Sequence, residues 1–267
     1  AKWSAYAVSV DPSPEGWDSF SFGVQSNANW WEHQYRPQKR IANGEGLLDS
    51  SGQLPWTFDV PLTEEPETRT VMVEVEVTDV SRQALANRSQ VLVHPADIYA
   101  GVKFDKGIGV AGAETAIEFV AVTPKGKAVS GTEVNFTVAR RTWDSIRKKD
   151  MDGHWTWENA VNDETVSTEK RTSGAEAKSF GWTPRKGGYY VVKAEVRDNE
   201  GRVSRTERGL YVAGAGATWA RDDSNKLTLI PDKQKYVPGN TARILVQAPR
   251  PGMSALVTVE REGVIDR

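Results

Sequence analysis

The stretch YYVVKAEVRDNEGRVSRTERGLYV, residues 189–212, decides the fold class. Its two halves alternate between apolar and polar residues, as strands with one buried face do. The four residues DNEG between them, 198–201, are turn formers, because Asp and Asn side chains bond the backbone and Gly accepts a positive φ. The sequence therefore predicts a hairpin of two antiparallel strands.

The same alternation recurs in other segments. In TVMVEVEVTDV, residues 70–80, valines alternate with polar or larger residues, so Glu74 and Glu76 should lie on the face opposite the valines. TEVNFTVARR, residues 132–141, alternates in the same way. No segment of ten or more residues keeps an apolar stripe at helical spacing. We therefore expect an all-β protein, with at most a short helix or turn over residues 143–153.

The chain also repeats itself, which indicates tandem domains. DKGIGVAGAETAIEFVA, residues 105–121, matches DKQKYVPGNTARILVQA, residues 232–248, at an offset of 127 residues. VEVEVTD, residues 73–79, matches VKAEVRD, residues 192–198, at an offset of 119 residues. Intervals of this length suit one β-sandwich domain each.

These repeats predict a tandem array of antiparallel, immunoglobulin-like β-sandwich domains. The units are residues 1–95, residues 98–213 and residues 220–267. Only the middle unit has both the opening and the closing strand patterns, so we expect the first unit to be shortened at its start and the third at its end. Six residues are expected in the core of the middle unit: Val134, Phe136, Val138, Val192, Ala194 and Val196.

Two stretches between the units are expected to be linkers. They are HPADIYAG, residues 94–101, and AGAGATWARDDSN, residues 213–225. Tyr99 and Trp219 should fill the joints between the units. Ala255 to Val264 should form an inner strand of the third unit.

Composition excludes several classes of function. Of the 267 residues, 38% are hydrophobic and 26% are charged, as in an ordinary folded protein. The formal net charge is -2, so no overall positive field attracts nucleic acid or an anionic membrane, and no apolar run is long enough to span a bilayer. Absence of cysteine excludes disulfides, thiolate nucleophiles and cysteine-bound zinc within this sequence. We expect no nucleic-acid partner and no direct insertion into a membrane.

No catalytic, cofactor-binding or metal-binding residue is predicted. His33, His94 and His154 lie far apart, without the spacing of a metal site. DMDG at 150–153 and RDNEG at 197–201 lack the remaining ligands of a calcium loop and are read as turns, and GEG at 44–46 has no phosphate-loop context. The acid pairs at 64–65 and 222–223 suit solvated loops rather than a cleft with two carboxylates. We expect no enzyme activity and no cofactor.

Ten tryptophans are unusual for a chain of this length. They cluster at Trp30 and Trp31, at Trp143, and at Trp155 and Trp157. An exposed aromatic platform could stack on carbohydrate, whereas a long hairpin could fold its tryptophans over the sandwich with arginines stacked on them. The repeat favours the structural interpretation. Trp155 and Trp157 should share one strand face in either case.

The stretch LTLIPDKQKYVPGNTARILVQAPRPGMSALVTVEREGV, residues 227–264, resembles the alpha-2-macroglobulin family, in particular its bacterial branch. The family pattern is a strand, a turn DKxxYxPGxTA, a second strand and then ALVTVERxGV. Here it is carried by Asp232, Tyr236, Pro238 and Gly239, and by residues 255–264. The stretches GVAGAETAIEFVAVTPKGKAVSGTEVNFTVARRTW, residues 109–143, and GEGLLDSSGQLPW, residues 44–56, resemble the two preceding macroglobulin domains.

The resemblance implies a scaffold fragment of a broad-spectrum protease inhibitor. Such proteins trap proteases that cut a bait region, and many carry a Cys-x-x-Gln thioester, which this cysteine-free sequence lacks. The implied partners are target proteases, through the full-length protein, and other domains of the same chain. The implied location is the periplasm or cell envelope, as a lipoprotein anchored through another part of the parent chain. The alternatives are an immunoglobulin-like adhesin array and a tryptophan-rich glycan-binding module.

Overall fold

The computed structural model describes residues 1–24, 36–61, 63, 66–149, 152–218, 227–233, 235–247, 254, 256, 258–260 and 264–266. Within these residues the secondary structure is strand, with no helix, which confirms the all-β prediction. Apart from β6 and β12, the paired strands run antiparallel.

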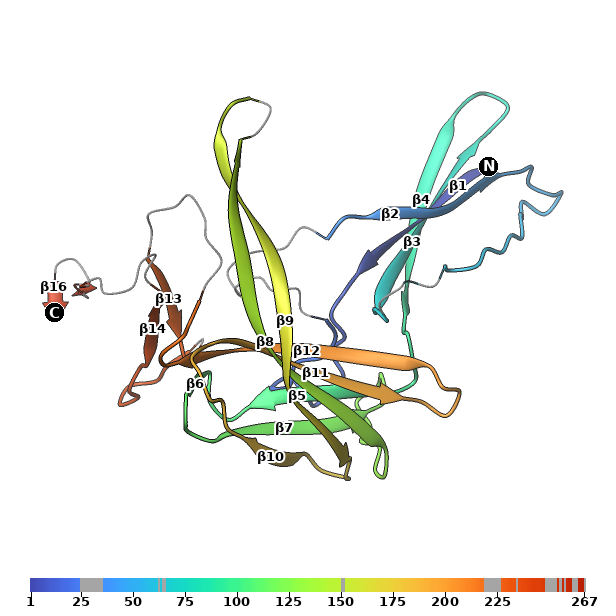
Figure 1. Ribbon diagram of the computed structural model, residues 1–267. Helices are drawn as coiled ribbons and strands as arrows, with labels where there is room; N and C mark the ends of the chain where they lie inside the picture. Colours follow the sequence, from blue (N-terminus) through green and yellow to red (C-terminus); the bar gives the residue numbers. More distant parts are fainter. Residues whose placement is uncertain are drawn as a thin grey trace.

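The N-terminal sheet has the strand order β2-β1-β3-β4 (Figure 1). Its strands are β1 (Lys2–Ser9), β2 (Lys39–Glu45), β3 (Arg69–Thr78) and β4 (Ala84–Val93). Along β3 the valines are more buried than Glu74 and Glu76, as the alternation predicts. On one face of this sheet Trp56 stacks on Trp3, with ring centroids 4.3 Å apart.

The next strands form two sheets that pack face to face as a sandwich. One sheet has the order β10-β7-β5 and the other has the order β6-β12-β11-β8-β9. The three-stranded sheet contains β5 (Tyr99–Phe104), β7 (Thr115–Val122) and β10 (Lys178–Trp182). The five-stranded sheet contains β6 (Ile108–Val110), β8 (Glu133–Lys149), β9 (Trp155–Thr172), β11 (Gly188–Arg197) and β12 (Val203–Ala213).

The core lies between the inner faces of these two sheets. At its centre Phe136 of β8 meets Phe119 of β7 at a centroid distance of 5.1 Å and Phe180 of β10 at 5.0 Å. Each predicted core residue is at most 1% exposed: Val134, Phe136, Val138, Val192, Ala194 and Val196. The prediction of this core is therefore confirmed.

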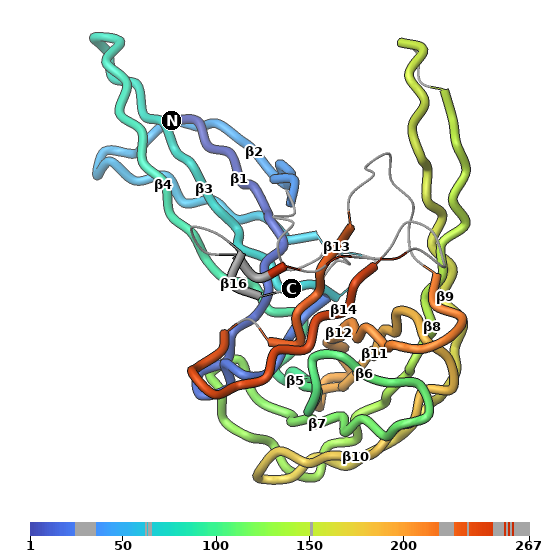
Figure 2. The backbone as a smooth tube through the Cα atoms, turned by 90° about the vertical axis from the view of Figure 1, so that its left-hand side faces the viewer, coloured from blue at the N-terminus to red at the C-terminus, as the bar shows by residue number. Residues whose placement is uncertain are grey.

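The remaining strands form two short hairpins. They are β13 (Thr228–Pro231) with β14 (Ile244–Gln247), and β15 (Val259–Glu260) with β16 (Val264–Asp266). The first hairpin lies beside the end of the sandwich that carries β6 (Figures 1 and 2). Of the strand expected over residues 255–264, the structure describes β15 and the first residue of β16, and most of the other positions lie outside the described residues.

The sequence repeats correspond to repeated turn chemistry. Asp79 after β3 and Asp198 after β11 each use Oδ1 to accept a hydrogen bond from the backbone N–H four residues later, at 2.8 and 2.9 Å. In the other repeat, Asp105 and Asp232 each accept a bond from the backbone N–H eleven residues later, at 2.9 and 3.0 Å. One pair thus matches at the 119-residue offset and the other at the 127-residue offset.

The structure differs from three local expectations. Residues 143–149 are not a helix or turn but the continuation of β8, which pairs with β9 as far as Lys149 and Trp155. This hairpin does not fold over the sandwich: its outer part, residues 141–149 and 155–163, projects away from it and is called the arm below (Figure 1). The first linker is also shorter than expected, because Tyr99 already begins β5.

Replacing Phe136 with alanine is expected to lower the free energy of unfolding by about 3–5 kcal/mol, because it opens a cavity between two other phenylalanines. Urea denaturation followed by circular dichroism measures this change. Leu85→Ala is the matched control, since Leu85 is 79% exposed and should change stability by at most about 0.5 kcal/mol. Equal, small effects of the two substitutions would show that the sandwich core does not lie between these sheets.

Candidate functional site

A segment between β1 and β2 completes the edge of the sandwich. We call residues 12–24 the strap. Ser21 exchanges two backbone hydrogen bonds with Val102 of β5, at 2.9 and 3.0 Å. Two residues later the carbonyl of Gly23 accepts a bond from the N–H of Glu207 of β12, at 3.0 Å. The strap therefore links the edges of the two sheets, and it satisfies edge groups that would otherwise need water.

Side chains hold the strap in place as well. Phe22 is 3% exposed and lies over Gly101, where an added Cβ would come within 2.6 Å of the ring. Trp17 donates its indole N–H to the carbonyl of Gly126, at 2.9 Å. Burying one phenylalanine ring stabilises the docked state by about 1.5–3 kcal/mol. The strap is thus bonded to the sandwich at several separate points.

Tyr99 fills the joint between β4 and the sandwich. It is 1% exposed, and its hydroxyl is hydrogen-bonded to the Thr68 hydroxyl at 2.6 Å and to His94 Nδ1 at 2.7 Å. Burial raises the pKa of Tyr99 to about 12, so the hydroxyl stays neutral in ordinary buffers. Burial likewise lowers the pKa of His94, and the charge of Asp97 opposes that change in part. Three segments of the chain therefore meet at one hydroxyl group.

The joint after β12 is bonded too. The N–H of Gly187 donates to the carbonyl of Ala215 at 2.9 Å. The guanidinium of Arg140 donates to the carbonyls of Gly187 and Gly216. At Gly187 a Cβ would lie 2.2 Å from the carbonyl oxygen of Gly214, so the close approach needs glycine there. The run of Gly and Ala after β12 is held against the sandwich rather than standing free.

The arm is fixed at its base by charge. Arg141 donates two hydrogen bonds to the carboxylate of Asp163, at 2.6 and 2.7 Å. Lys193 of β11 lies 3.4 Å from the same carboxylate. The bonds from Arg141 hold the pKa of Asp163 below its usual range, although burial opposes them. A paired, half-buried carboxylate at this place anchors the arm to the five-stranded sheet.

One face of the arm is aromatic. The register places Trp143 opposite Val161, Arg147 opposite Trp157 and Lys149 opposite Trp155. Because these positions lie two or four residues apart along each strand, their side chains share one face, as expected for Trp155 and Trp157. Trp155 is 52% exposed, and the Arg147 guanidinium lies 5.8 Å from its ring centroid. Trp30 and Trp31 lie outside the described residues.

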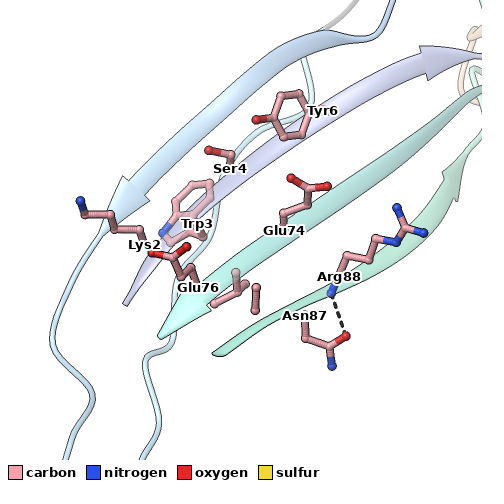
Figure 3. Close-up of a pocket in the computed structure, with 10 residues that line it drawn as sticks. Lys2, Trp3, Ser4, Tyr6, Glu74, Glu76, Asn87 and Arg88 are labelled. Carbon is pink, nitrogen blue, oxygen red and sulfur yellow. Dashed lines mark hydrogen bonds between the residues drawn. The ribbon is translucent and has the colours of Figure 1, made fainter. Parts of the chain in front are cut away.

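A hollow of about 610 Å³ opens on the N-terminal sheet (Figure 3). Its walls come from β1, β3 and β4, and its charged residues alternate in sign. Lys2 pairs in register with Glu76, and Arg88 pairs with Glu74, so each carboxylate has a cationic cross-strand neighbour. Opposite charges at such positions stabilise a sheet. This arrangement suits strand pairing better than an acid–base pair facing a substrate.

The motifs singled out in the sequence take ordinary structural places where they are described. Asp198 and Gly201 form the turn of the β11–β12 hairpin, and Gly44 lies in β2. His33, Asp150, Trp219 and the acid pairs at 64–65 and 222–223 lie outside the described residues. Within the described ranges, no three His, Asp or Glu side chains are grouped closely enough to hold a metal ion. No helix suited to crossing a membrane occurs in the same ranges.

Comparison with known proteins agrees with this architecture. Residues 101–211 match the family described as bacterial macroglobulin domain 6. An alpha-2-macroglobulin homolog from a Nostoc species is 28% identical over 239 residues, which is 88% of this chain and 12% of that protein. Residues 101–211 thus match a domain of the bacterial alpha-2-macroglobulin family, and the rest of the chain resembles that family.

Solved structures of this family share the fold. The native conformation of Escherichia coli alpha-2-macroglobulin superposes with a TM-score of 0.57 at 16% identity, covering 93% of this chain and 16% of that one. The same E. coli protein activated by porcine elastase gives a TM-score of 0.55 at 17% identity, covering 86% and 19%. The chain therefore spans only about an eighth to a fifth of the length of these relatives.

The strap was not predicted from the sequence. Its aromatic residues Trp17, Phe20 and Phe22 follow no strand or helix period that would point to a partner. The partner strand also lies about eighty residues away, between Ser21 and Val102. The one feature of the sequence that could have indicated a buried segment here is the three aromatic residues within six positions.

The joint at Tyr99 should weaken in mild acid. Burial lowers the pKa of His94 from an ordinary value of 6.5, so the unfolded chain binds this proton more readily than the folded chain. The contribution of His94 to the free energy of unfolding is therefore complete above about pH 6.5. It falls as the pH drops below that value. We expect the urea midpoint to decrease from pH 7 to pH 5.5, and to decrease less in His94→Gln. Val80→Ala, at a fully exposed position without a titratable side chain, is the control and should keep the wild-type slope. Equal slopes in the wild type and in His94→Gln would contradict the prediction.

Proposed function

We propose that this chain is part of the scaffold of a bacterial protease inhibitor of the alpha-2-macroglobulin type. The observation that carries the proposal is the strap, through which the first unit completes the sandwich of the second. A scaffold that must move its domains together when a bait is cut needs such shared structure, because a flexible linker transmits little force. Members of the family act as inhibitors and not as enzymes, and we assign no catalytic role to this chain.

The proposed units are residues 1–95, residues 98–213 and residues 220–267. Bonded joints at Tyr99 and at Arg140 support this division, because each lies between one sheet system and the next. The proposed location is the periplasm or cell envelope, with a membrane anchor elsewhere in the parent protein. The proposed partners are target proteases, which the parent protein would bind through its bait region.

The trap is tested with the full-length protein that contains this chain. After incubation with elastase, the mixture should cleave a small peptide substrate at the usual rate but should lose most of its activity on casein. The double variant Trp17→Ala, Phe22→Ala should protect casein less completely, because the first two units would no longer move as one body. Val80→Ala, at a fully exposed position, is the matched control.

Two outcomes separate the parts of this proposal. Unchanged hydrolysis of casein by the wild-type mixture would refute the inhibitor function. Protection of casein by the double variant equal to that of the wild type would leave the inhibitor function standing and would refute the role of the strap.

The aromatic face of the arm favours one other function, binding of a glycan. Half-exposed Trp155 and its neighbour Trp157 present their side chains on one face of a projecting hairpin, where sugar rings could stack. Titration with a chitin oligosaccharide should then shift the tryptophan fluorescence in a saturable way, and Trp155→Ala should abolish the shift. Fluorescence that stays constant through the titration would rule this function out.

A further inference from the structure

A cavity of about 490 Å³ lies where the middle sandwich meets the β13–β14 hairpin. The strap contributes Ser19 and Ser21, and the sandwich contributes the loop between β5 and β6 and part of β12. The hairpin contributes Asp232, Lys233 and Arg243. All three proposed units therefore contribute walls to one cavity.

The walls are held close together by backbone packing. At Gly107 an added Cβ would lie 1.8 Å from the carbonyl oxygen of Asp232, so the two loops are in direct contact. Asp232 also organises its own side of the cavity: its Oδ1 accepts bonds from the Tyr236 hydroxyl at 2.6 Å and from the N–H of Arg243 at 3.0 Å. The cavity is thus a built feature of the joint and not a gap between independent bodies.

Positive charge predominates in the cavity. Two carboxylates line it, Asp105 and Asp232, and both accept backbone hydrogen bonds within their own turns. Five cationic side chains line it: Lys103, Lys106, Arg208, Lys233 and Arg243.

These cations differ in how far they are already neutralised. Lys103 lies 2.8 Å from Glu118, and Lys106 lies 3.6 Å from Asp105. By contrast, among the described residues no carboxylate lies within 4.0 Å of the side-chain nitrogens of Lys233 or Arg243. Two exposed cations on the hairpin are therefore available to an incoming ligand.

Arg208 adds a cation that is largely shielded from water. It sits on β12 between Glu207, which bonds the strap, and Gly209, which also lines the cavity. Burial lowers its pKa, which means that its charge is poorly solvated in this position. Guanidinium groups suit such a ligand, because they bind the planar or tetrahedral oxygens of carboxylates and phosphates with paired hydrogen bonds.

We propose that this cavity binds a small oxyanion with two or more negative charges, of the phosphate class. The cationic groups and the two serine hydroxyls are the donors that such an anion needs, and the cavity volume exceeds that of a single phosphate group. Because the cavity walls belong to the strap, the sandwich and the hairpin, a bound anion would hold the third unit in a fixed position on the second.

The proposal is tested by isothermal titration calorimetry, in which inorganic pyrophosphate is added to the protein at constant ionic strength and the heat of binding is measured. We expect saturable binding by the wild type. The double variant Lys233→Gln, Arg243→Gln should bind at least about tenfold more weakly, since each substitution removes a charge-assisted hydrogen bond to the anion. Both positions are exposed, so the variant should keep the wild-type circular dichroism spectrum.

The matched control is Lys125→Gln, Lys127→Gln, which removes the same charge from an exposed turn away from the cavity. It should bind pyrophosphate as the wild type does. A parallel titration with citrate distinguishes phosphate from polycarboxylate as the source of the oxyanion, with weaker binding of citrate expected. Absence of saturable pyrophosphate binding, or equal weakening in the two double variants, would overturn the proposal.

Discussion

The pairing of the strap with two sheet edges is the constraint on which the rest of this structure depends. In the sandwich β5 is an edge strand, and β12 is paired with β6 only at its end. Exposed edge groups are a liability, because they attract other strands and lose hydrogen bonds when they are buried without partners. Ser21 and Gly23 satisfy both edges from one short segment. The first unit cannot leave the second without exposing them again.

The joints on either side of the sandwich are also closed by hydrogen bonds. Tyr99 connects β5 to the end of the N-terminal sheet through hydroxyl hydrogen bonds, and Arg140 holds the chain after β12 against the sandwich. Packed interfaces switch between discrete arrangements rather than deforming continuously. A set of units joined in this way can therefore move as one body up to the point where a joint opens. That behaviour suits the scaffold role proposed for this chain.

Much of the fold could be predicted because its information is local and periodic. The turns at Asp79 and Asp198 are specified by the side chain that bonds the backbone, and the core residues of β8 and β11 are specified by alternation. The repeats also predicted where equal turn chemistry recurs, at offsets of 119 and 127 residues.

The strap and the arm could not be predicted in the same way. The strap is defined by contacts between segments distant in sequence, such as Trp17 with Gly126, and nothing local indicates them. In the arm, polar and aromatic residues from Trp143 onward replace the valines that mark a buried strand, so the alternation loses its apolar contrast although the pairing continues. The cavity at the third unit combines both difficulties, because Arg208 and Arg243 are brought together only by the docked hairpin.

The most direct test of the central role of the strap is a distance measurement between the first unit and the sandwich. Because the chain has no cysteine, spin labels can be attached to Ser89→Cys on β4 and Lys178→Cys on β10 without competing sites. Pulsed electron resonance should give one narrow distance distribution, which broadens when Phe22→Ala is added. A distribution that is broad already in the parent pair, or one that stays narrow with Phe22→Ala, would contradict the conclusion that the strap fixes the two units together.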